Sequence, residues 1–163
     1  MYSVDLPSKK TLFQIQAERL LKVKELASSM NQNKKISLPW YIMTSTATWE
    51  STVEFFRKNN YFGLNSSEVI FFEQGTSPCF NYDGRIILDR KHKISRAPDG
   101  NGGLYKALLK EGILDDMATK GLKYVHIYCV DNILVKMADP IFTGFCISKN
   151  ANCGSKVIDF LLI

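Results

Sequence analysis

The sequence lacks the features that would place the protein in a membrane or outside the cell. Its 163 residues contain no apolar run close to the roughly 20 residues that span a bilayer. No apolar stretch follows a positive segment at the N-terminus, as it does in a secretory signal. We therefore expect a cytoplasmic protein that has no membrane partner.

Recognisable catalytic and metal motifs are also missing. The four cysteines lack the paired C-x-x-C spacing of a zinc site, so we expect free, reduced thiols. The chain has neither a Rossmann G-x-G-x-x-G nor a Walker phosphate loop, and no nucleophile arrangement of the Ser/His/Asp or Cys/His kind. No residue is therefore assigned as catalytic.

The chain contains no internal repeat, low-complexity tract or linker-like segment, and its length suits one domain. The net charge of +5 is moderate. Its one dense basic run, "DRKHK", has no aromatic residues between the charges, which a nucleic-acid surface would favour. We expect a single domain with no nucleic-acid partner.

Helix-like and strand-like segments alternate along the chain. Apolar residues recur at helical spacing after Thr11, which can form a capping box with Gln14, and Thr48 can cap a second helix. Continuous apolar strands alternating with helices are typical of a parallel sheet covered on both faces. The expected helices cover 11–29, 48–56, 104–111 and 114–120, and the expected strands cover 38–45, 69–72 and 123–130.

One segment departs from this pattern. Asp83 and Gly84 stand between two β-prone runs, which is a strong hairpin signal. The sequence therefore predicts an α/β fold, with a mostly parallel sheet flanked by helices and a β-hairpin excursion.

Polar residues follow two of the expected strands. Gln74 comes directly after one and Asp131 directly after another, while a glycine cluster over 100–103, with Asn101 inside it, precedes a helix. Ligands in parallel α/β sheets bind beyond the carboxyl ends of the strands. These residues are therefore expected to converge on one crevice.

The chemistry of these residue types suits a nucleotide. Glycines let backbone N–H groups approach an anion or a base edge, and the helix N-terminus adds partial positive charge. A carboxylate at Asp131 can hold a divalent metal or a ribose hydroxyl. The glycine cluster can equally be a plain turn into a helix, and Asp131 can cap the segment that begins at Asn132. His126, in the middle of an expected strand, is given no role.

Six ordered stretches resemble the eukaryotic UDP-N-acetylglucosamine pyrophosphorylases and cover the chain from Met1 to about Val157. They are "LPSKKTLFQIQAERLLK", "PWYIMTS", "YFGL", "VIFFEQG", "APDGNGGLYKAL" and "YCVDNILVKMADPIFTGFCI". The resemblance implies a Rossmann-like nucleotidyltransferase domain of the GT-A type. It also implies that UTP and N-acetylglucosamine 1-phosphate are joined with Mg²⁺, releasing pyrophosphate.

The resemblance also implies roles for particular residues. Gln74 and Gly100 match positions that contact UTP, and Asn101 matches a position that contacts the sugar substrate. Asp131 matches the acidic residue at the nucleotide and metal site. All four lie in the segments that the strand-end argument selects.

The sequence departs from this family at both ends. The family's glycine-rich loop and Pro-Lys-Gly, which grip the phosphates, would precede Met1, and its further sugar-binding region would follow the final "IDFLLI", where 159–163 look like a strand. We therefore expect residues 1–163 to be a single, incomplete nucleotidyltransferase domain, truncated and weakly active or inactive. The alternatives are a non-catalytic nucleotide-sugar-binding or interaction fragment, and a uridylyltransferase for another hexose 1-phosphate.

Overall fold

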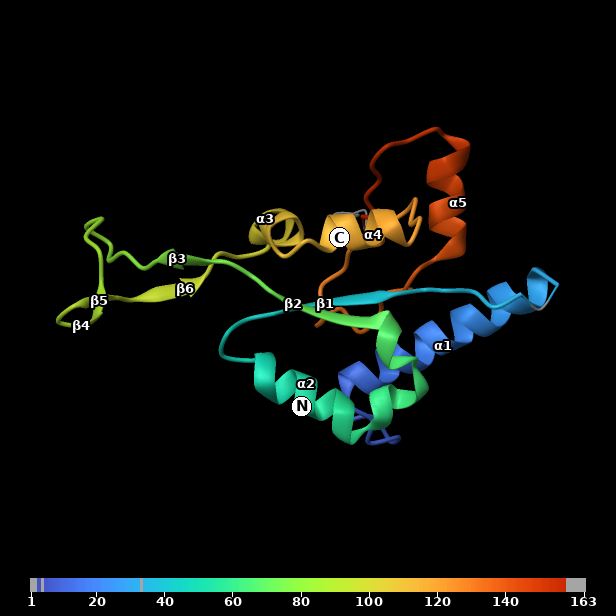
Figure 1. Ribbon diagram of the computed structural model, residues 1–163, viewed down its shortest axis with the longest axis horizontal. Helices are drawn as coiled ribbons and strands as arrows, with labels where there is room; N and C mark the ends of the chain where they lie inside the picture. The colour runs from blue at the N-terminus through green and yellow to red at the C-terminus, as the bar shows by residue number, and fades with distance from the viewer. Residues whose placement is uncertain (1–2, 4, 33, 158–163) are drawn as a thin grey trace, which may run out of the picture.

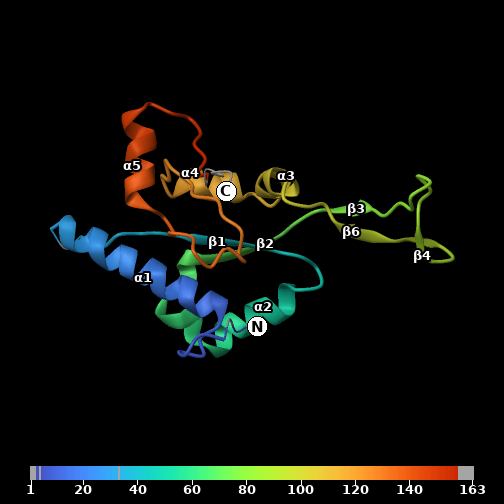
Figure 2. The same ribbon diagram turned by 180° about the vertical axis from the view of Figure 1, so that it is seen from behind.

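The computed structural model describes residues 3, 5–32 and 34–157. Within them, helices lie on both sides of a short parallel sheet, and a thin β-arm projects away from this body (Figure 1). The view from behind gives the same order of layers (Figure 2). The α/β prediction is confirmed, while the strand expected over 159–163 lies outside the described residues.

Helix α1, Leu12–Met30, begins where the sequence predicts. The Thr11 hydroxyl accepts a hydrogen bond from the Gln14 backbone N–H at 3.3 Å, which satisfies one free donor of the first turn. Only half of the expected capping box forms, because the Gln14 side chain donates to Glu18 instead. The inward face of the helix buries Ala17 and Leu20.

Strands β1, Trp40–Thr44, and β2, Val69–Glu73, form a parallel pair in which Trp40 lies opposite Val69. They are connected by α2, Trp49–Lys58, and by two short 3₁₀ turns, Asn60–Gly63 and Ser66–Glu68. The prediction that Thr48 caps α2 through its side chain is wrong. That hydroxyl is directed to Ser45, where it accepts from the backbone N–H at 3.0 Å.

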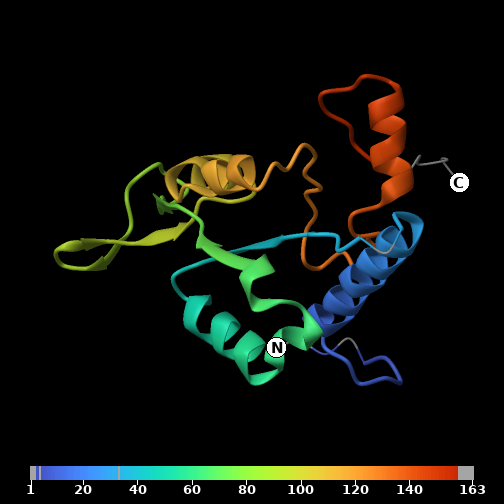
Figure 3. The same ribbon diagram turned by 45° about the vertical axis from the view of Figure 1, so that its right-hand side comes forward.

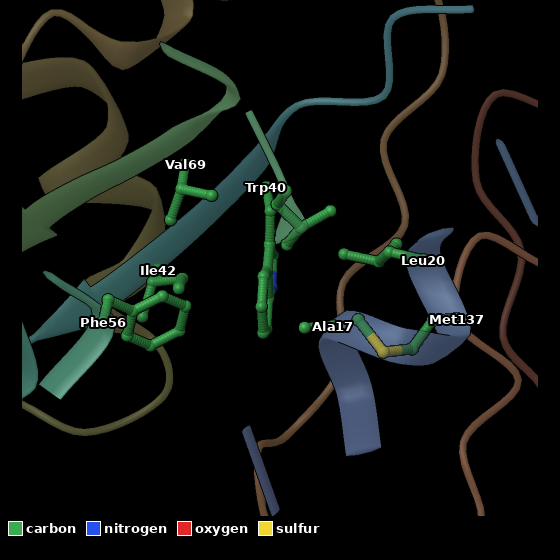
Figure 4. Packing of buried hydrophobic residues seen from close by; sticks show 8 residues of the cluster. Ala17, Leu20, Trp40, Ile42, Phe56, Val69 and Met137 are labelled. Atoms are coloured by element: carbon green, nitrogen blue, oxygen red, sulfur yellow. The ribbon is translucent and has the colours of Figure 1, made fainter. Parts of the chain in front are cut away.

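Alternation along the two strands divides the core into two clusters. Trp40 and Ile42 face α1 and α2, where Phe56 is fully buried (Figure 4). Phe72 and its neighbours face the opposite helices, α3, Gly103–Lys110, and α4, Ile113–Thr119. Each face of the small sheet therefore has its own apolar layer.

The hairpin excursion is confirmed and is longer than the sequence predicts. The Asn81 N–H donates to the Arg85 carbonyl at 2.9 Å across the turn that contains Asp83 and Gly84. The segment projects from the body as an arm (Figure 3). The arm contains four short strands in two antiparallel pairs: β3, Thr76–Pro78, with β6, Arg96–Pro98; and β4, Leu88–Arg90, with β5, Lys93–Ile94.

The strand expected over 123–130 does not form. None of the described residues pairs with this segment in a ladder, and Tyr124, Val125 and Ile127 are each more than half exposed. Side chains of α1 hold its end instead, because the Gln16 amide donates to the Val130 carbonyl at 2.8 Å. The apolar run predicts an extended segment, but only a neighbouring strand can make it part of a sheet.

A helix that the sequence analysis does not predict, α5, Pro140–Ser148, ends the described fold. The Asp139 carboxylate accepts from the Ile141 backbone N–H at 3.0 Å. Aspartate at the N-cap followed by proline at the first helical position is a standard signal for the start of a helix. This helix could therefore have been predicted from the sequence.

His126 gives the fold a pH dependence. Its Nδ1 accepts a hydrogen bond from the Ala138 backbone N–H at 3.1 Å, which requires the neutral ring. Burial lowers the pKa of His126, and nearby Lys156 adds to this, while the Asp139 carboxylate opposes it. The unfolded chain therefore binds the proton at a higher pH than the folded protein does. The contribution of His126 to the free energy of unfolding is fully present above the ordinary histidine pKa of about 6.5 and decreases as the pH drops below it.

We expect the free energy of unfolding to fall between about pH 7.5 and about pH 5.5, the range in which histidine titrates. Urea titrations at both values measure it. His126→Asn is the matched control, since its amide oxygen keeps an acceptor near the Nδ1 position without titrating. An equal decrease in the variant would assign the pH dependence to other groups.

Candidate nucleotide site

The structure places Gln74 next to a backbone contact that leads to the glycine cluster. Gln74 follows β2 and extends the parallel ladder, since its N–H donates to the Thr44 carbonyl at 2.8 Å. The next carbonyl, that of Gly75, accepts from the Asp99 N–H at 3.1 Å. Asp99 directly precedes Gly100. The residues that follow β2 and those that begin the glycine cluster, which are far apart in the sequence, therefore meet at the end of β2.

The glycines at this junction permit a close approach. The Asp99 carboxylate lies between Gly75 and Gly103: a Cβ on Gly75 would lie 2.5 Å from Asp99 Oδ2, and one on Gly103 would overlap Oδ1. Gly100 has a φ of +77°, which favours glycine. The chain needs these glycines to make the turn, so the turn alternative accounts for part of the cluster.

Asp99 is a site residue that the sequence analysis missed. Its Oδ1 is buried and has no hydrogen-bond partner among the described residues. The signal lies in the sequence, because Asp99 directly precedes the glycine cluster, but its position between two glycines depends on the fold.

Asn101 and Asp131 line a second feature, a cavity of about 970 Å³. Its lining comes from β1 and the extended segment 124–131, together with residues of α1, α3, α4 and α5. Aromatic and aliphatic side chains dominate the lining, and the described lining residues include no lysine, arginine or glutamate. Apolar walls with a few polar groups are typical of a ligand site.

The four predicted residues therefore fall into two adjoining pairs. Gln74 and Gly100 flank the contact between Gly75 and Asp99, whereas Asn101 and Asp131 share the cavity. Gly100 and Asn101 are consecutive, so the pairs meet there. The cavity does not include Gln74 or Gly100 in its lining.

The donor set suits a metal that is shared with a ligand. No group of three or more histidine, cysteine, aspartate or glutamate side chains comes together within the described ranges. Asp131 is an exposed carboxylate. Mg²⁺ is commonly held by one or two carboxylates, with substrate phosphates and water completing the shell. A single exposed carboxylate such as Asp131 is compatible with that arrangement.

Comparison with known proteins adds to this geometry. The profile of the family described as UTP–glucose-1-phosphate uridylyltransferase matches residues 1–160. The chain belongs to this uridylyltransferase family. No helix in the described part of this family member is long and apolar enough to cross a membrane.

Curated relatives within the family carry names that refer to N-acetylated sugars. The chain is 56% identical over 159 residues to UDP-N-acetylhexosamine pyrophosphorylase-like protein 1 of Xenopus tropicalis, covering 98% of this chain and 31% of that protein. It is 49% identical over 161 residues to UDP-N-acetylglucosamine diphosphorylase 2 of Arabidopsis thaliana, covering 96% and 32%. The chain thus spans about a third of the length of these relatives.

A solved structure of a uridine diphosphate N-acetylglucosamine pyrophosphorylase from Trypanosoma brucei, in complex with an inhibitor, has the same fold over this region. The TM-score is 0.84 at 33% sequence identity, covering 93% of this chain and 31% of that one. This confirms that the described fold is part of a pyrophosphorylase-like α/β domain.

Proposed function

We propose that this chain forms the nucleotide- and sugar-facing part of a UDP-N-acetylglucosamine diphosphorylase. That enzyme joins UTP and N-acetylglucosamine 1-phosphate, giving UDP-N-acetylglucosamine and pyrophosphate. The observation that supports this most is that the two pairs of predicted residues adjoin, in a chain of the uridylyltransferase family. Gln74 and Gly100 belong to the end of β2, Asn101 and Asp131 line the cavity, and Gly100 and Asn101 are consecutive.

Each predicted residue has a role in the proposal. Gln74 and the backbone at Gly100 bind the uridine nucleotide, and the Asn101 amide binds hydroxyl or acetamido groups of the sugar. Asp131 holds the nucleotide and Mg²⁺. When bound, the metal neutralises charge on the phosphates during attack of the sugar phosphate on the α-phosphorus of UTP.

The same geometry indicates weak turnover by the 163-residue chain. Phosphoryl transfer depends on cationic groups that stabilise the developing charge, and removing one such contact typically costs about 10²-fold or more in rate. The described lining of the cavity contains no lysine or arginine. This favours a second candidate function, a fragment that binds nucleotide sugar without catalysis.

Calorimetric titration of the chain with UDP-N-acetylglucosamine, UDP-glucose and UTP tests the proposal. We expect the N-acetylated ligand to bind more tightly than UDP-glucose, and Asn101→Ala to weaken that preference by about tenfold, the effect of losing one or two polar contacts. Asn152→Ala is the control, since Asn152 is exposed and far along the chain from the site. Failure of all three ligands to bind would contradict the proposal.

Two further measurements separate the alternatives. Asp131→Asn should remove the dependence of UTP affinity on Mg²⁺, because the neutral amide no longer supplies an anionic oxygen to the metal. Pyrophosphate release from UTP and N-acetylglucosamine 1-phosphate measures turnover: slow release supports weak catalysis, none supports the binding fragment, and robust release contradicts both. Tighter binding of UDP-glucose would favour another hexose 1-phosphate.

A cytoplasmic location belongs to the same proposal. All four cysteines are free, as expected in a reducing compartment.

A further inference from the structure

Three dipeptides of the chain combine an asparagine or aspartate with a following glycine. They lie at 83–84, 99–100 and 101–102. In such a pair the glycine nitrogen can attack the side-chain carbonyl carbon and close a five-membered ring, because glycine has no Cβ to hinder the approach. The structure distinguishes the three pairs by how firmly each is held.

Two of the pairs are restrained. In the hairpin turn, the Gly84 N–H donates to the Asn81 carbonyl at 3.0 Å, and the Asp83 carboxylate accepts from the Asn81 amide at 3.4 Å. The Asp99 carboxylate is enclosed between two glycines of the junction. In the first pair the attacking N–H is bonded, and in the second the carboxylate that would be attacked is enclosed.

The third pair, Asn101 and Gly102, lies between β6 and α3, where the arm joins the body (Figure 1). Both residues are exposed, and a Cβ on Gly102 would meet no atom within 4 Å. Within the described part of the chain, no hydrogen bond involves the Asn101 side chain or the Gly102 N–H. Neither reacting group is therefore restrained by its surroundings.

The local turn keeps these two groups apart. The Gly103 N–H donates to the Gly100 carbonyl at 3.0 Å, and the Leu104 N–H donates to the Asn101 carbonyl at 3.3 Å. Exposed turns with few buried contacts open at a small cost in free energy. Once this turn opens, the Asn101 amide can rotate over the Gly102 nitrogen.

We propose that Asn101 and Gly102 form a self-modification site, at which Asn101 loses its amide group. The Gly102 nitrogen gives its proton to solvent and attacks Asn101 Cγ. The bond from Cγ to the side-chain nitrogen then breaks, and that nitrogen takes a proton from solvent and leaves as ammonia. One water molecule opens the resulting succinimide ring, so the net reaction consumes one water and releases one ammonia.

The ring opens in two directions. Water that attacks Cγ gives aspartate at position 101, and water that attacks the main-chain carbonyl carbon gives isoaspartate, in which the backbone runs through the side-chain carboxyl. Both products carry a new carboxylate just before α3, where the N-terminus of the helix stabilises negative charge. Because the ammonia is lost to solvent, the modified form accumulates with time.

The consequence for the candidate site rests on the proposed function. Asn101 lines the cavity together with Asp131. The reaction replaces a neutral group that both donates and accepts hydrogen bonds by one that only accepts, and isoaspartate also lengthens the backbone beside Gly100. We therefore expect the modified chain to lose its preference for UDP-N-acetylglucosamine over UDP-glucose.

Peptide mapping of the 163-residue chain by mass spectrometry tests the modification. The chain is kept in weakly alkaline buffer, because the attacking species is the deprotonated nitrogen, and the conversion of each asparagine is followed with time. Asn101 should convert at least about tenfold faster than Asn152, which is also exposed but precedes Cys153, whose side chain hinders the attack. Detection of isoaspartate at position 101 identifies the succinimide route.

Gly102→Ala is the matched variant. It places a methyl group beside the attacking nitrogen, in open space, and should slow the conversion of Asn101 by about tenfold. An unchanged thermal unfolding curve shows that the variant is folded. Equal rates in the variant and the original chain would overturn the proposal, as would conversion of Asn101 that is no faster than that of Asn152.

Ion exchange then separates the modified chain by its extra negative charge. Calorimetry compares its binding of UDP-N-acetylglucosamine and UDP-glucose with that of freshly prepared chain. Equal preference in the two forms would show that the modification does not alter the site. A fresh chain that binds neither ligand contradicts the proposed function, whereas the conversion rates decide the modification independently.

Discussion

Phe56→Ala is expected to lower the free energy of unfolding by about 3–5 kcal/mol, the usual effect of removing a buried phenyl ring. Phe56 is fully buried, and its ring meets those of Phe13, Trp40 and Phe71 at centroid distances of 5.1, 5.6 and 5.2 Å. These rings come from α1, β1 and β2. One side chain therefore connects the helix layer to both strands, and its loss leaves a cavity that no single element can close.

Urea denaturation measures this effect, and Phe55→Ala is the matched control. Phe55 is only partly buried, and its ring lies 6.5 Å from Phe56 and 5.6 Å from Phe62. Since small domains have a total stability of about 5–15 kcal/mol, Phe56→Ala should remove a large part of it, while Phe55→Ala should not. Equal losses would show that Phe56 is not the centre of the core.

Gly103→Ala is expected to disrupt the junction at the proposed nucleotide site. The added Cβ would overlap the Asp99 carboxylate, so this side chain must leave its position between Gly103 and Gly75. Such overpacking typically costs about 1–3 kcal/mol. We expect a corresponding loss of stability and at least a tenfold loss of affinity for UDP-N-acetylglucosamine, measured by thermal unfolding and calorimetry.

The neighbouring glycine provides the control. A Cβ on Gly102 meets nothing within 4 Å, and the residue has an α-helical φ of −66°. Gly102→Ala should leave both quantities close to those of the original chain. If the two alanine variants behave alike, the carboxylate does not hold the junction together.

Local signals account for the elements that the sequence predicts correctly. The Thr11 cap and the helical spacing of apolar residues define α1, and the apolar runs at 40–44 and 69–73 become a parallel pair because they are neighbours in space. The run at 123–130 has the same composition and forms no strand. Strand formation depends on a partner, and composition does not reveal whether a partner is present.

Part of the candidate site could likewise be predicted from the sequence alone. The position of Gln74 and Asp131 after apolar segments selects them without knowledge of the fold. Asp99 was missed because its importance comes from two glycines, Gly75 and Gly103, which lie on either side of it only after the chain folds back. The roles of Gln74, Gly100, Asn101 and Asp131 stay predictions until binding is measured.

The polar contacts of α1 affect the order in which the protein folds during synthesis. The Gln16 side chain donates to a carbonyl 114 residues later, and Arg19 donates to one 116 residues later. At about 5–20 residues per second, the ribosome needs roughly 6–23 s to add that length. Gln16 and Arg19 therefore gain these carbonyl partners long after α1 has emerged, whereas the apolar face of the helix packs against Trp40 and Phe56, which follow it much sooner.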